Sequence, residues 1–286
     1  GFDCMARRRS EPVADVASDD ASLAWVASCV NDPLRFVEEG FPWGVKGTLL
    51  EDESGPDEWQ RELLTDLGDA LEARARAAVG GDAHAIAAAQ EQVDGALRFA
   101  VGSGHGVGKT TIVAWLVLWF ICTRPNPQII VTANTNAQLT GKTWRELAKW
   151  NRLLRVGSWL QWSVQKLALK AAPDTWYASA VPWSKERAEA FAGTHEKHVL
   201  LIFDEASAIE DVIWEVAEGA MTTTGAMWFV FGNGTRNTGR FRECFRRFKH
   251  RWRTRTVDSR TAKKADQNQI QQWAEDYGED SDFFRV

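Results

Sequence analysis

The sequence predicts an α/β fold in which helices flank a mostly parallel β-sheet. Three observations support this prediction. Short runs rich in Val, Ile, Leu and Phe recur along the chain, helical patterns separate them, and several of the runs end in glycines or carboxylates. Strands that alternate with helices form parallel sheets, and such sheets bind ligands at the carboxyl ends of their strands. We therefore expect the functional residues to lie where strands end.

Composition limits the class of protein. A chain of 286 residues can form one large domain, or a main domain with a smaller annex, and 44% hydrophobic with 26% charged residues is typical of a globular protein. The net charge of −5 gives no overall sign of nucleic-acid binding. The four cysteines are scattered without a CxxC pair, so neither a zinc site nor a disulfide framework is predicted. A reducing, intracellular setting follows.

The first hundred residues predict a helical annex. Residues 1–20 are small and charged and predict a flexible start. A short helix is expected over 22–30, and the prolines and glycines of 31–44 predict a loop. Asp57 is the expected N-cap of a long helix, because apolar residues recur every four positions from Trp59 to Val79. An alanine-rich helix over 82–93 leads to the first strand.

The remaining chain alternates strands and helices. An unbroken apolar helix of 11 residues, 112–122, is too short to cross a bilayer and is expected to be buried. An amphipathic helix is expected over 138–154. The expected strands, the third of them a strand or an edge hairpin and the last an edge strand, are 97–101, 128–135, 175–183, 198–203, 226–231 and 251–257.

A glycine-rich stretch joins the first strand to the apolar helix. It reads GSGHGVGKTT from Gly102, and we name residues 102–108 the glycine loop. Strand, glycine turn and helix in this order predict a phosphate-binding P-loop, in which backbone N–H groups point at a polyphosphate. Lys109 would reach the β- and γ-phosphates, and the Thr110 hydroxyl would bind Mg²⁺. Ser103 stands where the strict pattern has glycine, and an ordinary glycine-rich turn is the alternative.

Two carboxylates follow the strand that ends at Phe203. Asp204 is expected to hold Mg²⁺ together with Thr110, and Glu205 is expected to polarise the attacking water as general base. An acid pair of this kind favours hydrolysis coupled to work over phosphoryl transfer to a small acceptor. The alternative is a solvated turn.

Two further polar residues are candidates. Asn233 follows the strand that ends at Phe231, where it could sense the γ-phosphate or the lytic water; a tight turn with a capping Asn is the alternative. A Gln amide can pair with the N6 and N7 atoms of adenine, so Gln60 is a candidate for the base, although surface Gln residues on helices are common.

These motifs, in this order, resemble the ATPase domain of large terminase subunits, the DNA-packaging motors of tailed bacteriophages. The resemblance extends from residue 31 to the end of the chain, and the segments that carry it are DPLRFVEEGFPWG, GPDEWQRELL, SGHGVGKTT, VTANTNAQLTGKTWRELAKW, FAGTHEKHVLLIFDEAS, FVFGNGTRNTGRF and VDSR. It implies a P-loop NTPase fold of the RecA-like, additional-strand type, with ATP and Mg²⁺ as cofactors. It also implies double-stranded DNA, a portal protein and a small terminase subunit as partners, a homo-oligomeric ring on the procapsid with a monomer in isolation, no membrane, and the host cytoplasm.

The resemblance assigns roles residue by residue. Gln60 matches the adenine-binding Q motif, Lys109 and Thr110 match Walker A, Asp204 and Glu205 match Walker B, and 232–235 matches the coupling motif. His105 stands where some members carry an arginine. The expected catalytic residues are Glu205, Lys109, Asn233 and Arg236. The expected nucleotide-binding residues are Gln60, Ser103, Gly104, His105, Gly106, Val107, Gly108, Lys109, Thr110 and Thr111.

Packaging rings complete each site with an arginine from the neighbouring subunit. Ala192 occupies the position at which related chains carry an arginine, so Arg236 is the first candidate, followed by Arg187 and Arg240.

The resemblance also divides the chain. We expect a flexible terminus over 1–20, a helical annex and adenine-side segment over 21–96, and the ATPase core over 97–257. Residues 258–286 would begin a linker to a nuclease domain that this chain does not contain, so ATP hydrolysis without DNA cleavage is expected.

A basic stretch over 236–255 stays open to two interpretations. It could grip DNA phosphates, or it could be a solvated amphipathic helix that buries Phe241, Phe245 and Phe248; their helical spacing favours the second. Two other functions also stay open. A helicase-like motor should carry a second RecA-like domain, and a non-catalytic nucleotide-binding module would not need Glu205.

Overall fold

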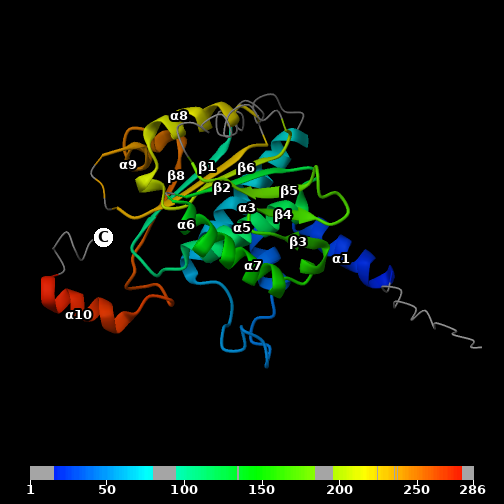
Figure 1. Cartoon of the computed structure of the whole chain (residues 1–286), viewed down its shortest axis with the longest axis horizontal. Helices are drawn as coiled ribbons and strands as arrows, with labels where there is room; N and C mark the ends of the chain where they lie inside the picture. Colours follow the sequence, from blue (N-terminus) through cyan, green and yellow to red (C-terminus); the bar gives the residue numbers. More distant parts are fainter. Residues whose placement is uncertain are drawn as a thin grey trace, which may run out of the picture.

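An eight-stranded β-sheet runs through the described part of the chain, with helices packed on both of its faces (Figure 1). The computed structural model describes residues 16–79, 95–133, 135–183, 196–223, 225–234, 236 and 238–278. The strands follow the order β3-β4-β5-β2-β6-β7-β1-β8. Their bounds are Leu97–Ser103 for β1, Gln128–Thr132 for β2, Leu160–Trp162 for β3, Lys166–Leu169 for β4, Tyr177–Ala180 for β5, Val199–Phe203 for β6, Met227–Gly232 for β7 and Arg253–Val257 for β8.

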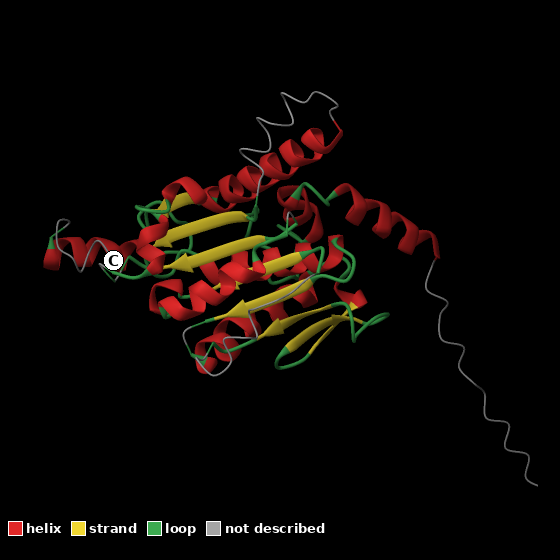
Figure 2. Cartoon of the chain, turned by 90° about the horizontal axis from the view of Figure 1, so that it is seen from above, coloured by secondary structure: helices red, strands yellow, loops and turns green. Residues whose placement is uncertain are grey.

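Six neighbouring strands, from β5 to β8 in the sheet order, are parallel, and β3 and β4 pair antiparallel at one edge (Figure 2). Gly102 of β1 lies opposite Gly232 of β7, and Thr132 of β2 lies opposite Phe203 of β6. The carboxyl ends of four strands therefore meet at one edge of the sheet. The predicted α/β fold with a mostly parallel sheet is confirmed, and β8 is an edge strand as predicted.

The lower face of the sheet in Figure 1 is covered by the larger helical layer. Helix α5, Lys109–Thr123, is buried at every position from Ile112 to Ile121, because it packs between the sheet and other helices. The other α-helices described before residue 154 are α1 (Val16–Ser28), α2 (Pro33–Gly40), α3 (Glu58–Val79), α6 (Asn136–Gln138) and α7 (Trp144–Leu153). Four rings, Phe41, Trp43, Trp115 and Trp150, contact one another with centroids 4.8–6.3 Å apart. This cluster attaches the segment after α2 to α5 and α7.

The upper face carries helix α8, Asp211–Ala220, and the short helix α9, Arg240–Cys244 (Figure 1). The 3₁₀ turns η4 (Ala206–Ala208) and η5 (Lys249–Arg251) lie in the same part of the chain. Trp214, Trp228 and Trp252 form an aromatic core with Phe203 on this face, with ring centroids 5.1–6.1 Å apart. Each face of the sheet therefore has its own apolar core.

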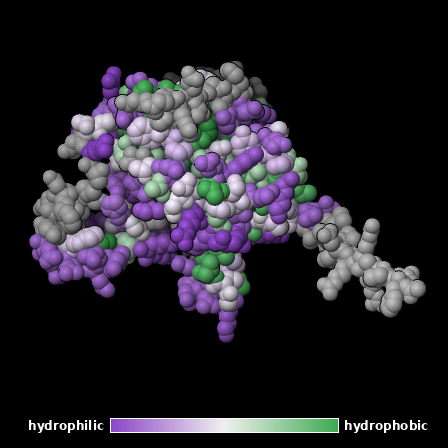
Figure 3. All heavy atoms as spheres, in the orientation of Figure 1, coloured by the Kyte–Doolittle hydropathy of each residue, from purple (hydrophilic) through white to green (hydrophobic). Residues whose placement is uncertain are grey.

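The two ends of the described chain lie on opposite sides of the sheet. Helix α10, Gln267–Tyr277, lies beyond the edge at which the parallel strands end, and α1 lies at the other side (Figures 1 and 2). Figure 3 shows a largely hydrophilic surface with scattered apolar areas. In the part of the chain that the structure describes, no helix is both long and apolar enough to span a bilayer.

Two local predictions are wrong, and a third, the helix over 138–154, is refined. Residues 31–44 are not a loop throughout, because Pro33 begins helix α2: Asp32 caps the helix by accepting a hydrogen bond of 2.9 Å from the backbone N–H of Arg35, and proline favours the first helical position. The helix expected over 138–154 is present, and it contains a π-helical turn at Leu139–Thr143. The basic stretch is not one helix: it forms the short α9 and η5 and the beginning of β8, with Phe241 buried and the two later phenylalanines half-buried.

Other predictions concern residues outside the described part of the chain. These are the first fifteen residues, the alanine-rich helix over 82–93, and Arg187 and Ala192. The hairpin of β3 and β4 has no counterpart among the predicted strands. The division of the chain at residues 20, 96 and 257 stays a prediction.

Candidate functional site

The glycine loop lies between the end of β1 and the beginning of α5. Gly106 and Gly108 have φ of +75° and +90°, a left-handed backbone that favours glycine. The loop leads directly into the N-terminus of α5, where unpaired N–H groups and the helix dipole favour binding of an anion. Thr110 is half-buried in the first turn of α5, and Ser103 donates a hydrogen bond of 3.0 Å to the carbonyl oxygen of Gly104. Local backbone geometry therefore supports the predicted phosphate cradle.

Lys109 points into the site and is only 8% exposed. Its Nζ donates to the carbonyl oxygen of Gly104 at 2.9 Å and to Oδ1 of Asn233. Burial lowers the pKa of Lys109, while the charges of Glu205 and Asp204 oppose that shift. A buried ammonium group, stabilised by the charges of two carboxylates, therefore lies at the centre of the predicted site.

Asn233 connects the end of β7 to the glycine loop. Its Nδ2 donates to the ring of His105, 3.0 Å from Nε2, while its Oδ1 accepts from Lys109. Gly232, the residue before it, packs against the ring of Phe241, from which an added Cβ would lie only 2.9 Å away. The structure thus brings together Lys109, His105 and Asn233 from two strand ends.

Asp204 and Glu205 form the turn after β6. Asp204 is 1% exposed; burial raises the pKa of its carboxyl group, and a hydrogen bond from Thr143 opposes the rise. Glu205 has φ of +54°, uncommon for a residue with a side chain, and its backbone N–H donates to Oδ1 of Asp204 at 3.0 Å. Strained backbone of this kind clusters at functional sites. The two carboxylates of this turn therefore lie in different environments: Asp204 is buried, and Glu205 is partly exposed.

Thr143 is a site residue that the sequence analysis missed. Its Oγ1 donates a hydrogen bond of 2.6 Å to Oδ2 of Asp204. Thr143 ends the π-helical turn, a feature often found at functional sites. The polar run Gly141-Lys142-Thr143 inside an amphipathic helix is the only available signal.

The start of α3 holds the glycine loop from outside. Nε1 of Trp59 donates to the carbonyl oxygen of Val107 at 3.0 Å, and Nε2 of Gln60 donates to that of Gly108 at 3.1 Å. Gln60 is 1% exposed, and its Oε1 accepts from the backbone N–H of Asp57. The structure thus places Gln60 against the glycine loop, and its adenine role stays a prediction.

The segment after β8 packs on the same side. The backbone N–H of Lys263 donates to Oδ2 of Asp57 at 2.7 Å, and the backbone of Ala265 approaches Gly106. Ala262 and Ala265 are buried. This part of the predicted linker is therefore attached to the core.

Thr111 and Arg236 differ from the other predicted residues. The Thr111 hydroxyl donates to Oε1 of Glu146 at 3.2 Å, which joins α5 to α7. Arg236 is exposed after β7 and borders a cavity of about 340 Å³. Gly102, Gly104, Arg242 and Arg246 line the same cavity.

The donor set fits magnesium. The Thr110 hydroxyl and the Asp204 carboxylate are hard oxygen donors, and Mg²⁺ usually takes one or two carboxylates, keeps several waters and binds substrate phosphates. Among the described residues no group of three or more His, Cys, Asp or Glu side chains could hold a metal ion, so a caged metal site is not formed there.

Comparisons with known proteins agree with this geometry. No protein-family model matches the chain. Over 155 residues the chain is 28% identical to the probable large terminase subunit of Enterobacteria phage P7, a match that covers 51% of this chain and 31% of that protein. The chain therefore spans about a third of the length of this curated relative.

Two solved structures share the fold. The large terminase of a thermophilic bacteriophage is 12% identical with a TM-score of 0.51, and the match covers 65% of this chain and 46% of that one. The large terminase ATPase domain of Thermus phage P74-26 is 16% identical with a TM-score of 0.50, over 66% of this chain and 85% of that one. The match in sequence and the shared fold together support a large terminase ATPase domain as the family to which this chain is similar.

Proposed function

We propose that the chain is the Mg²⁺-dependent ATPase motor domain of a large terminase, which couples ATP hydrolysis to translocation of double-stranded DNA into a procapsid. The observation that carries the proposal is the convergence of Lys109, Asn233 and the Asp204–Glu205 turn on one glycine loop. A phage large terminase as curated relative supports the choice of motor.

The chain's residues would divide the chemistry between them. The N–H groups of the glycine loop and the ammonium of Lys109 bind the β- and γ-phosphates. Thr110 and Asp204 hold Mg²⁺, which when bound withdraws charge from the phosphate oxygens. Glu205 accepts a proton from the attacking water, and Asn233 orients that water or the γ-phosphate.

Charge explains why Lys109 is suited to this role. Burial disfavours its charged form, and the protein itself offers it two carboxylates and an amide oxygen. A polyphosphate supplies several negative charges at short range, so its binding offsets the cost of the buried ammonium. The site is thereby selective for highly charged phosphates.

The wider assembly follows from the same proposal. Partners would be double-stranded DNA, the portal protein and the small terminase subunit, and the motor would work as a homo-oligomeric ring in the host cytoplasm. Arg236, exposed at the turn after β7, is the first candidate for an arginine that acts on a neighbouring site. DNA cleavage would belong to a separate nuclease domain.

The test separates nucleotide binding from turnover. Glu205→Gln should bind a fluorescent ATP analogue as the wild type does but release phosphate about 100-fold more slowly, as expected for loss of a general base. Lys109→Ala should lose binding. Glu215→Gln, an exposed acid on α8, is the matched control and should keep both.

Three outcomes would contradict parts of the proposal. Full turnover by Glu205→Gln would remove that residue from the mechanism. Nucleotide binding without turnover in the wild type assembled with DNA would favour a non-catalytic module. Strand separation of a duplex would favour a helicase-like motor.

A further inference from the structure

The basic segment 236–255 contains two different groups of cations. It carries nine Lys or Arg side chains and one acidic residue, although the whole chain has a net charge of −5. The cations of one group, named the neutralised group, pair with carboxylates inside the protein, and those of the other group do not. The two cations outside these groups are Arg242, which pairs with the adjacent Glu243 at 3.6 Å, and Arg236, which is exposed after β7.

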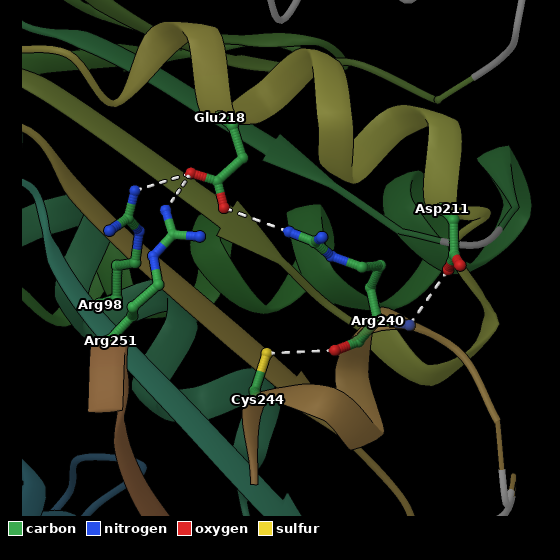
Figure 4. A network of polar contacts seen from close by, with 6 residues as sticks. All are labelled: Arg98, Asp211, Glu218, Arg240, Cys244 and Arg251. Carbon is green, nitrogen blue, oxygen red and sulfur yellow. Dashed lines mark hydrogen bonds and ion pairs between the residues drawn. The ribbon is translucent and has the colours of Figure 1, made fainter. Parts of the chain in front are cut away.

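The neutralised group is arranged around Glu218 of α8. Its carboxylate pairs with Arg98 at 2.7 Å, Arg251 at 2.9 Å and Arg240 at 3.2 Å (Figure 4). Burial lowers the pKa of Arg98, Glu218 opposes this shift, and Arg251 adds to it. Each of the three guanidinium groups thus has the Glu218 carboxylate as a partner inside the protein.

Arg255 also belongs to the neutralised group. It pairs with Glu62 and, at 2.6 Å, with Asp66 of α3. These contacts attach β8 to α3, so Arg255 is a structural cation.

The ring of Phe248 contacts cations of both groups. The guanidinium carbons of Arg240, Arg247 and Arg251 lie 4.5, 5.3 and 5.9 Å from its ring centroid. Cations are attracted to the face of an aromatic ring. Arg240 and Arg251 are thereby fixed from both sides, by Phe248 and by Glu218, and Arg247 is held on the exposed side.

The second group has no counter-charge. Arg246, Arg247, Lys249 and Arg253 are exposed, and no carboxylate among the residues that the structure describes pairs with any of them. We name these four residues the basic surface. Cations that lack a carboxylate partner and repel their neighbours are available to an anionic partner.

We propose that the basic surface binds the phosphates of double-stranded DNA without reading its sequence. The choice of DNA as the anionic partner rests on the proposed function. The division of the cations into the neutralised group and the basic surface rests only on the contacts given above. Arginine suits this task because its planar group pairs with phosphate oxygens. Arg246 also lines the cavity of about 340 Å³ against Gly102 and Gly104. DNA would therefore bind beside the nucleotide cradle.

The test measures binding of a fluorescein-labelled 30-base-pair duplex by anisotropy, without nucleotide, at several NaCl concentrations. Arg247→Gln, Lys249→Gln and Arg253→Gln are combined in one variant, which leaves out Arg246 because it borders the glycine loop. Its matched control combines Arg145→Gln, Arg152→Gln and Lys170→Gln. This control also removes three positive charges, but from exposed positions on another face. The basic-surface variant should lose at least about 10-fold in affinity, and its salt slope should fall by about 2–3. The control should change less than about twofold.

Three results would overturn the proposal. One is an equal loss of affinity in both triple variants, which would mean that only net charge matters. The second is competition by polyglutamate as effective as that of unlabelled duplex at equal charge, which would indicate an acidic protein partner. The third is absence of duplex binding by the wild type. Binding of a fluorescent ATP analogue by the same variants, expected to be unchanged, distinguishes failure of this proposal from failure of the ATPase proposal.

Discussion

The hydroxyl of Thr143 donates a 2.6 Å hydrogen bond to Oδ2 of Asp204, across 61 residues of sequence. It joins the π-helical turn before α7 to the end of β6. Asp204 receives a second hydrogen bond from the backbone N–H of Glu205, so both carboxylate oxygens are fixed. The orientation of the proposed magnesium ligand therefore depends partly on Thr143, which comes from a different element.

Replacement of Thr143 by Val should weaken the response to Mg²⁺, because residues that orient metal ligands typically contribute about 10–100-fold to metal affinity or activity. Thr143→Ser keeps the hydroxyl and should behave nearly as the wild type. The measurement is the Mg²⁺ concentration dependence of ADP binding by calorimetry, together with turnover. Equal Mg²⁺ dependence in the Val and Ser variants would show that the hydrogen bond does not position Asp204.

Replacement of Asn233 by Asp should weaken nucleotide binding by about 10-fold. The new carboxylate would pair with Lys109 and add negative charge where phosphates are expected to bind. The substitution also removes the amide N–H group that donates to His105. Titration with a fluorescent ATP analogue measures the change. Raising the NaCl concentration should not restore binding, since the pair is buried and poorly screened. Unchanged affinity would separate Asn233 from the phosphate site.

Replacement of Gly232 by Ala should destabilise the protein by about 1–3 kcal/mol, because the added methyl group would lie 2.9 Å from the ring of Phe241 and 3.1 Å from the backbone nitrogen of Ser207. Gly234, two residues later, faces open space, so Gly234→Ala is the control. Urea unfolding of both variants gives the comparison. Equal free energies of unfolding would mean that the turn after β7 adjusts without cost.

Stability should fall as the pH drops from 7.5 to 5.5, partly through His198. Burial lowers the pKa of His198 below its usual 6.5, and the charges of Arg124 and Lys197 add to this shift. The unfolded chain therefore takes up the proton first, and the free energy of unfolding decreases as the pH falls through about 6.5. His198→Gln should reduce the loss in Tm over this range by on the order of 1 °C. Differential scanning calorimetry at both pH values checks it; an unchanged pH dependence would exclude His198.

The site is largely predictable from the sequence because its residues follow strand ends. Lys109, Asp204 and Asn233 each come soon after an apolar run, and parallel strands bring such positions to one edge. The contacts between them are not predictable. Thr143, which hydrogen-bonds Asp204, is the last residue of a π-helical turn, and no spacing in the sequence specifies that turn.

The errors in the fold have local physical causes. Proline usually breaks a helix, yet Pro33 occupies the first turn of α2, where a missing N–H is harmless. The basic segment has phenylalanines at helical spacing, but arginines at the same spacing repel one another, and α9 ends at Cys244. The hairpin of β3 and β4 is short, and strands of three and four residues give almost no alternation to detect.

The hydrogen bonds from α3 to the glycine loop have a consequence for the direction of its amides. A peptide unit is planar and trans, so its C=O and N–H point in opposite directions. Trp59 and Gln60 hold the oxygens of Val107 and Gly108, which turns the N–H groups of Gly108 and Lys109 away from α3. Two side chains about fifty residues upstream thus fix the direction of two peptide dipoles in the phosphate cradle.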